Sequence, residues 1–180
     1  NTVHNSDLLP LQEFAIRNNL KIVYGMENIS DKTLIVSHMY ASNVTGEVYD
    51  VQDIFKKAKS FNAFTICDAT AAAGHININV KDANIDALYF SAHKMCGPSG
   101  VGVLYISRVI MRDLYPVSVG GGMVWQVGEQ KSEYRSDVKR YESGTPNISG
   151  VIGLGAAIDY LNNIGIASIR ETVENVIRYG

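Results

Sequence analysis

Two short, largely apolar runs constrain this chain most, because each leads directly into residues that can carry chemistry. Residues 63–67 end at Asp68, and residues 85–90 lead into Ser91, His93 and Lys94. Runs of this length, rich in strand formers, are typical of buried strands in a parallel sheet. In an open α/β sheet, ligands bind outside the carboxyl ends of the strands. The sequence therefore predicts a site that brings Asp68 and Lys94 together.

The chemistry of this pair is specific when the two residues are taken together. A lysine at the end of a buried strand is expected to be partly desolvated, which favours the neutral amine that forms Schiff bases with carbonyls. An aspartate facing a pyridine nitrogen and a lysine bonded to an aldehyde are the two groups that pyridoxal phosphate chemistry needs. Taken alone, Asp68 is equally well explained as a helix cap and Lys94 as its ion-pair partner.

The remaining patterns predict an α/β layered domain. Helical spacing is found over residues 7–18, 51–61, 148–164 and 166–179, and further strands are expected over 21–25, 33–38 and 101–106. The helix over 51–61 is expected to bury Val51, Ile54, Ala58 and Phe61 on one face. Residues 116–147 are expected to be irregular, and a loop of that length in a compact domain is usually functional.

Several motifs, in the same order along the chain, resemble those of the class V aminotransferases. They occupy residues 4–10, 37–46, 67–75 and 90–94. Two later motifs, Gly120–Met123 and Tyr141–Asn147, are similar to those of group II cysteine desulfurases and selenocysteine lyases. The resemblance implies the large domain of the type I pyridoxal phosphate enzymes, a three-layer, mostly parallel sheet with helices on both faces.

The same resemblance implies a role for each matching residue. Lys94 would bond to pyridoxal 5'-phosphate and move protons on the substrate, while Asp68 would keep the ring nitrogen protonated. His4 would stack on the ring and shuttle a proton. Ser91 and His93 would bind the phosphate group. These are the catalytic and cofactor-binding assignments carried by the strand-end motifs.

Three further positions follow from the resemblance. Asn43 would lie near the cofactor oxygen and the substrate carboxylate. Thr145 would reach the phosphate of the neighbouring subunit in a homodimer. Ala71 departs from the family, which usually carries a glutamine there that hydrogen-bonds to the phenolic oxygen of the cofactor. Alanine cannot make that bond.

The activity implied is a cysteine desulfurase. It would convert L-cysteine, or L-selenocysteine, to L-alanine and pass the sulfur to an enzyme persulfide for iron–sulfur cluster assembly, with a sulfur-acceptor protein as a partner. Cys67 lies in an apolar run, and Cys96 is interpreted as structural. The resemblance implies that the nucleophilic cysteine and the arginine that binds the substrate carboxylate lie outside these residues.

We expect residues 1–180 to be a partial cofactor-binding large domain that lacks the C-terminal small domain. The apolar stripe over residues 166–177 needs something to pack against, and the chain begins at Asn1 rather than Met. On its own, the segment is expected to be inactive. A cytoplasmic location is expected, or an organellar one if an N-terminal targeting segment is missing.

Composition excludes some other classes of function. The net charge is −2 and there is no basic block, so nucleic acid is not indicated as a partner. No apolar stretch is long enough to span a membrane. Two cysteines do not make a disulfide framework, and reduced thiols are expected. His38 and His75 lack ligands at metal-binding spacing, so no metal site is expected.

Three alternatives stay open. Another class V enzyme, such as a kynureninase-like lyase or an aminotransferase, would share Asp68 and Lys94. A non-catalytic paralogue would keep the fold and the dimer surface, and Ala71 favours it. A nucleotide-binding α/β domain is the third, although the glycines near Gly97 do not form a dinucleotide fingerprint.

Overall fold

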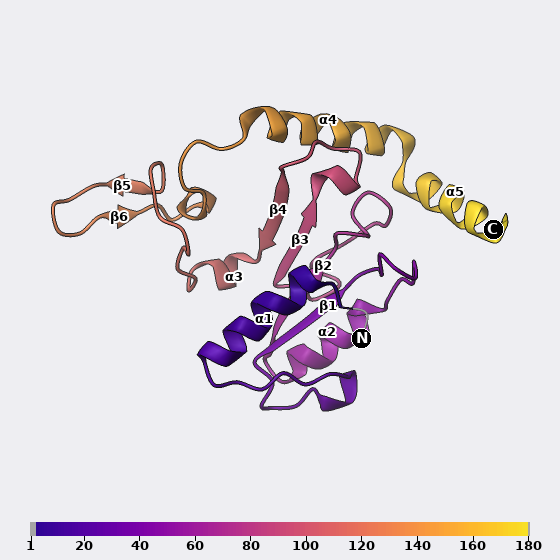
Figure 1. The fold of residues 1–180 in the computed structure, drawn as a ribbon, viewed down its shortest axis with the longest axis horizontal. Coiled ribbons are helices and arrows are strands. Elements are labelled where there is room, and N and C mark those ends of the chain that lie inside the picture. The colour runs from indigo at the N-terminus through magenta and orange to yellow at the C-terminus, as the bar shows by residue number, and fades with distance from the viewer. Residues whose placement is uncertain (1–2, 180) are drawn as a thin grey trace.

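A four-stranded sheet forms the centre of the computed structural model, which describes residues 3–179 (Figure 1). Its strands lie in the order β1, β2, β3 and β4; the first three are parallel and β4 is antiparallel to β3. The strands are β1 (Ile35–Met39), β2 (Phe64–Asp68), β3 (Ala87–Ser91) and β4 (Gly102–Ile106). The predicted α/β fold with a mostly parallel sheet is confirmed.

Helix α2 (Val51–Ser60) covers one face of the sheet. Asp50 caps the helix, because its carboxylate accepts hydrogen bonds from the backbone N–H groups of Gln52 and Asp53. Phe55 is completely buried and belongs to the same core cluster as Cys67 and Leu88. The prediction that Phe61 lies on the buried face of this helix was wrong, because Phe61 follows the last helical turn and is 37% exposed.

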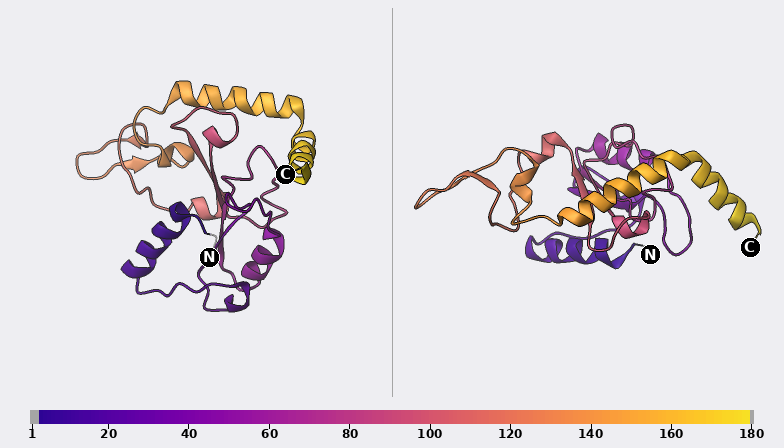
Figure 2. Two further views of the ribbon diagram at one scale, coloured as in Figure 1. Left: turned by 45° about the vertical axis from the view of Figure 1, so that its right-hand side comes forward. Right: turned by 90° about the horizontal axis from the view of Figure 1, so that it is seen from above.

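Helix α1 (Asn5–Arg17) lies over the opposite face, as the view from above in Figure 2 shows. Successive strand residues point to opposite faces of a sheet. In β3, Leu88 therefore joins the α2 side, while the Tyr89 hydroxyl donates to Asp7 of α1. Helices thus cover both faces, as the sequence predicted.

A second core cluster lies beneath α4 (Ile148–Ile164), which is followed by α5 (Ile166–Tyr179). Leu154 and Leu161 of α4 pack there with Met95, next to the loop after β3. Only the start of the predicted α5 stripe packs there, since Val176 is 67% exposed. Within residues 3–179, no single helix is long and apolar enough to cross a membrane. Helices α4 and α5 together reach that length and apolar content, but they are bent by 75° where they meet.

Two expectations about irregular and extended segments were wrong. Residues 21–25 form no strand, and Val23 and Tyr24 are largely exposed, because this run pairs with no strand of the sheet. Within 116–147, which was expected to be irregular, β5 (Val124–Gln126) and β6 (Glu133–Tyr134) pair as an antiparallel hairpin. The hairpin projects from the sheet in Figure 1, beyond the short helix α3 (Arg108–Met111).

This projecting arm, residues 115–138, exposes large apolar side chains. The Arg135 guanidinium lies 3.9 Å from the centre of the Trp125 ring, and it forms an ion pair with Asp137 at 2.7 Å. The side chains of Val117, Trp125 and Val127 are nevertheless more than half exposed. The arm therefore combines one completely buried side chain, Met123, with a few polar and stacking contacts.

The packing of α2 makes a testable prediction. Phe55→Ala removes a completely buried ring and leaves a cavity against the sheet, and we expect it to lower the free energy of unfolding by about 3–5 kcal/mol. Phe61→Ala, at the part-exposed residue that ends the same helix, is the matched control and should lower the free energy of unfolding by less than about 1 kcal/mol. Urea denaturation followed by circular dichroism measures both. Equal losses in the two variants would contradict this packing.

Candidate active site

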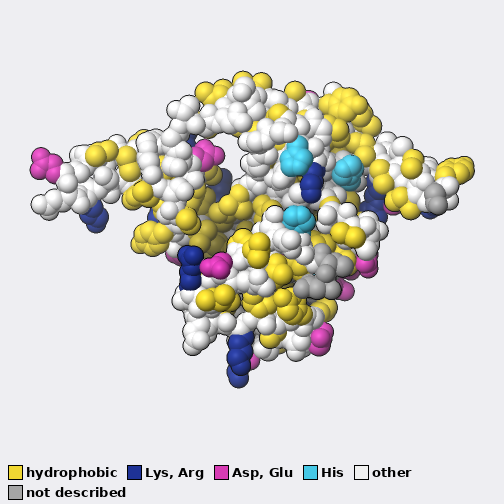
Figure 3. Space-filling model, in the orientation of Figure 1, with side chains coloured by type: hydrophobic (Ala, Val, Ile, Leu, Met, Phe, Trp, Pro, Cys, Tyr) yellow, Lys and Arg dark blue, Asp and Glu magenta, His cyan; other side chains and the backbone are white. Residues whose placement is uncertain are grey.

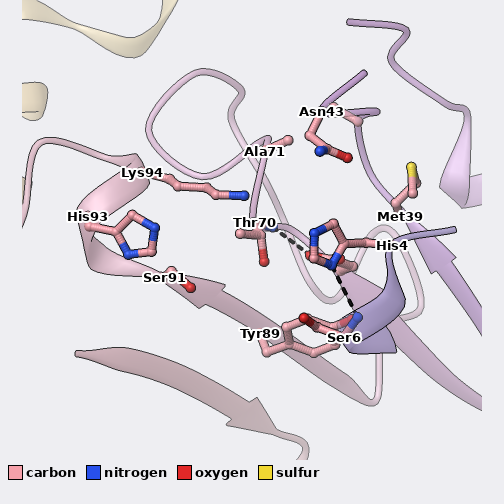
Figure 4. A pocket seen from close by; sticks show the side chains of 12 residues that line it. His4, Ser6, Met39, Asn43, Thr70, Ala71, Tyr89, Ser91, His93 and Lys94 are labelled. Carbon is pink, nitrogen blue, oxygen red and sulfur yellow. Dashed lines mark hydrogen bonds between the residues drawn. The ribbon is translucent and has the colours of Figure 1, made fainter. Parts of the chain in front are cut away.

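A pocket of about 330 Å³ opens at the carboxyl ends of β1, β2 and β3. Figure 4 shows its side chains converging from α1, the strand ends and the loops that follow them, and Figure 3 shows histidines gathered around a basic side chain on this face. It is lined by His4, Ser6, Met39, Ala41, Asn43, Asp68, Thr70, Ala71, Tyr89, Ser91, His93 and Lys94. The pocket therefore contains six of the seven predicted site residues.

Asp68 is the last residue of β2 and is buried at the floor of the pocket. Its Oδ1 accepts a hydrogen bond of 2.8 Å from the backbone N–H of Thr70, which turns the chain sharply after the strand. In the sheet, Asp68 pairs with Met39 on one side and with Tyr89 on the other. The carboxylate is thus fixed by both the strand register and the turn that follows.

Lys94 reaches the pocket from a 3-10 turn, Ala92–Lys94, that follows β3 directly. The carbonyl of Ala92 accepts hydrogen bonds from the N–H groups of Met95 at 3.0 Å and Gly97 at 2.9 Å. A Cβ on Gly97 would meet that same carbonyl oxygen at 2.9 Å, so the tight turn requires glycine there. Lys94 itself is exposed, so the expected partial desolvation of its amine is wrong for the chain by itself.

His4 enters the pocket as the N-cap residue of α1. Its Nδ1 accepts a hydrogen bond of 3.1 Å from the backbone N–H of Ser6. An imidazole nitrogen that accepts in this way carries no proton, so in the neutral ring the proton resides on Nε2. The capping bond fixes the ring at the mouth of the pocket and leaves Nε2 as the nitrogen that can donate.

The other predicted residues differ in where they lie. Ser91 ends β3, His93 lies in the turn before Lys94, and Asn43 lies in the loop after β1; all three line the pocket. Thr145 does not: it is exposed in the segment before α4. The structure leaves its predicted role across a dimer untested.

Ala71 lines the pocket beside Thr70. Residues 70–75 form a turn after β2, so the side chains of both Thr70 and Ala71 line the pocket. Sequence reasoning also missed Ser6 and Tyr89 as pocket residues. Strand alternation would have found Tyr89, because it lies two positions before Ser91 and so shares its face.

Comparison with known proteins identifies the family. Residues 4–180 match the family model for class V aminotransferases. The chain belongs to the class V aminotransferase family. It is 37% identical over 194 residues to a probable cysteine desulfurase of Borreliella burgdorferi, covering 98% of this chain and 46% of that protein. It is 35% identical to a probable cysteine desulfurase of Halalkalibacterium halodurans, covering 98% of this chain and 47% of that protein.

Solved structures give the same result for the fold. The apo structure of a cysteine desulfurase from Thermococcus onnurineus NA1 superimposes with a TM-score of 0.93 at 33% identity, covering 99% of this chain and 48% of that one. The S-sulfonic acid form of the cysteine desulfurase CsdA from Escherichia coli gives 0.88 at 30% identity, covering 93% and 45%. The chain therefore has the type I fold and spans about half the length of these class V relatives.

The two cysteines of this class V chain lie in different surroundings. Cys67 is completely buried in β2, and burial, followed by the charges of Asp68 and Asp7, raises the pKa of its thiol to about 12. A thiol with that pKa is not a thiolate at neutral pH and is a poor nucleophile. Cys96 is exposed but does not line the pocket. Within residues 3–179, no group of three His, Cys, Asp or Glu side chains is placed to hold a metal ion.

A buried polar network lies directly behind the pocket. The Asp7 carboxylate accepts from the Ser37 hydroxyl at 2.8 and 2.9 Å and from the Tyr89 hydroxyl at 3.0 Å. Asp7 is only 7% exposed, and this burial raises the pKa of its carboxyl, while the two hydrogen bonds act to lower it. The network ties the first turn of α1 to β1 and β3.

The raised pKa predicts a pH dependence of stability. Between the unfolded pKa of 3.8 and the higher folded pKa, the folded chain binds more protons at Asp7 than the unfolded chain does. The stabilisation that this provides is fully present below the unfolded pKa and is lost as the pH rises through the folded pKa. We therefore expect the unfolding free energy of the wild type, relative to Asp7→Asn, to fall as the pH rises above about 4 and through the raised folded pKa of Asp7.

Urea unfolding across that range measures the difference directly. Asp31→Asn is the matched control, because Asp31 is an exposed aspartate in a surface turn. The wild type and the control should show parallel pH curves. A wild-type minus Asp7→Asn difference that is flat with pH would contradict the raised pKa.

Proposed function

We propose that the complete protein is a pyridoxal phosphate-dependent cysteine desulfurase that converts L-cysteine to L-alanine and passes the sulfur to a persulfide on the enzyme. The observation that carries the proposal is the joint presence of Asp68 and Lys94 in one pocket, on adjacent strand ends of a class V chain. The similarity to proteins named cysteine desulfurases supports this reaction over others in the family.

The pocket residues match the chemical groups of the cofactor. Asp68 is a buried carboxylate suited to a protonated ring nitrogen. Ser91 and His93 flank the lysine turn and can donate to phosphate oxygens. His4 presents an imidazole at the pocket mouth, where it can stack on a flat ring. When bound, pyridoxal phosphate supplies an electron-withdrawing ring that stabilises negative charge on the substrate α-carbon.

Lys94 would perform the proton transfers in this proposal. Its amine would hold the aldehyde carbon of the cofactor, and once free it would serve as the base and acid at the α- and β-carbons of the substrate. The exposed state of Lys94 fits a group that must move between these tasks. Desolvation of its amine would then come from the bound ligand covering it.

The sulfur-accepting cysteine is proposed to lie outside these residues. Cys67 is buried with a thiol pKa of about 12, and Cys96 does not line the pocket. By the same proposal, Thr145 completes the phosphate site of a second copy in a homodimer. Delivery of sulfur to an acceptor protein for iron–sulfur cluster assembly, use of L-selenocysteine and a cytoplasmic location belong to the proposal as well.

The covalent role of Lys94 is tested on the complete protein loaded with pyridoxal phosphate. Borohydride reduction followed by peptide mass mapping should place the pyridoxyl group on Lys94. Lys94→Arg keeps the positive charge but cannot form the bond, so it should show neither the adduct nor the visible absorption band. Lys81→Arg, an exposed lysine outside the pocket, is the control and should behave as wild type. An adduct at another lysine would refute the assignment.

Asp68 supplies a second test. Asp68→Ala removes a charge-assisted hydrogen bond, and we expect cofactor binding to weaken by roughly 1.5–3 kcal/mol, with alanine release from L-cysteine sharply reduced. Asp68→Asn preserves the shape and shares the loss of charge, so it separates electrostatics from packing. Full activity in both variants would remove Asp68 from the mechanism. A wild-type protein that binds the cofactor without releasing alanine would favour a non-catalytic paralogue, the alternative suggested by Ala71.

A further inference from the structure

The Tyr89 hydroxyl lies between two buried carboxylates. Tyr89 of β3 is paired in register with Asp68 of β2, so their side chains lie side by side on the face that α1 covers. Asp7 reaches this position from the first turn of α1, and its Oδ1 is 3.0 Å from the Tyr89 hydroxyl. Tyr89 itself lines the pocket, next to Ser6 in Figure 4. The structure thus joins the proposed cofactor carboxylate to a second acid through one phenol.

A phenol has a single proton to donate, so it can satisfy only one of the two acids at a time. Burial, and then the charges of Asp7 and Asp68, raise the pKa of Tyr89, so its hydroxyl keeps that proton. Both carboxylates also act on it as hydrogen-bond acceptors. In the contact of 3.0 Å, the Tyr89 hydroxyl donates its hydrogen bond to Asp7. The direction of this one bond therefore decides how many donors Asp68 already has.

The surroundings of Asp7 favour this direction. Ser37 of β1 donates to both of its oxygens, so Asp7 is already placed to accept from the sheet. The nearby charged groups are Asp68 of β2, which raises the pKa of Asp7, and His38 of β1, which lowers it. Two buried carboxylates at close range are costly unless each has donors or a cation. Asp7 obtains its donors from the protein, whereas Asp68 borders the open pocket.

We propose that Asp7 and Tyr89 form a positioning pair: Asp7 holds the Tyr89 hydroxyl, which leaves the Asp68 carboxylate available to the protonated ring nitrogen of a bound pyridine cofactor. The inference rests on the proposed function, and it deepens that function by naming two residues that keep Asp68 available to the cofactor. Without the Asp7 carboxylate, the Tyr89 hydroxyl turns to Asp68 and competes with the ligand. No proton is transferred in this scheme; only the acceptor of one hydrogen bond changes.

A purely structural role for Asp7 predicts something different. The same hydrogen bonds also anchor α1, which carries His4, so a variant of Asp7 could weaken the site simply by loosening the helix. In that case, removing the Tyr89 hydroxyl as well would make the site worse. If Tyr89 competes for Asp68, removing its hydroxyl instead relieves the defect. Whether removal of the Tyr89 hydroxyl strengthens or further weakens cofactor binding in the Asp7 variant therefore separates the two explanations.

The experiment is a double-mutant cycle on the complete protein, with pyridoxal phosphate affinity measured by absorbance titration. We expect Asp7→Asn to weaken binding by about tenfold. The double variant should bind the cofactor more tightly than Asp7→Asn and recover to the level of Tyr89→Phe. Asp31→Asn is the control for loss of one surface charge. A double variant as weak as Asp7→Asn, or weaker, overturns the proposal.

A second measurement does not need the cofactor. Carbon-13 NMR of the aspartate carboxyls follows the titration of Asp7 in the free protein. Tyr89→Phe removes a hydrogen bond that lowers the pKa of Asp7, so its titration should move to higher pH, and an unmoved titration would overturn the Asp7–Tyr89 link. A wild-type protein that does not bind pyridoxal phosphate at all would instead overturn the proposed function, and with it the part of the inference that concerns Asp68.

Discussion

The pocket depends on the parallel register of three strands. Met39, Asp68 and Tyr89 are neighbours across β1, β2 and β3, so β1 and β2 end level with Tyr89, while β3 continues to Ser91. A slip of one residue would turn Asp68 to the α2 face, because side chains alternate along a strand. The register is also fixed at the other end of the sheet, where the Thr65 N–H donates to the Asp86 carboxylate at 2.9 Å and the Asp86 N–H donates to the Thr65 hydroxyl at 3.0 Å. The position of the carboxylate in the pocket is thus determined by hydrogen bonds several residues away.

The two faces of this sheet have different tasks. On the α2 side, Phe55 and Leu88 pack in a hydrophobic core, and Cys67 lies among them with a raised thiol pKa. On the α1 side, the same strands present Ser37, Asp68 and Tyr89, whose polar groups are bonded to one another, to α1 or to the following turn. One set of strands therefore provides both the hydrophobic stability and the polar floor of a site. The period-two alternation of strand residues separates the two environments.

Much of this arrangement could be predicted from local sequence patterns. Apolar runs that end in polar residues located β2 and β3, and the rule that parallel strands end at one edge brought Asp68 and Lys94 together. The failures arose where the outcome depends on a tertiary partner. Residues 21–25 have strand-like composition but find no strand to pair with, and Tyr89 shows its role only once α1 is placed over β3. The tight turn that needs glycine at position 97 depends on the close approach of the Ala92 carbonyl, which no periodicity in the sequence reveals.

The arm formed by residues 115–138 has a consequence for how association could be detected. An isolated two-stranded hairpin is marginally stable in water, and this one is supported by the buried Met123 side chain, the Trp125–Arg135 stacking and a few polar bonds. Its amide hydrogens should consequently exchange far faster than those of β1–β3 whenever the arm faces solvent. Any surface that covers Val117 and Trp125 would slow that exchange. The rate of amide hydrogen exchange in the arm therefore reports how much of its apolar surface is covered.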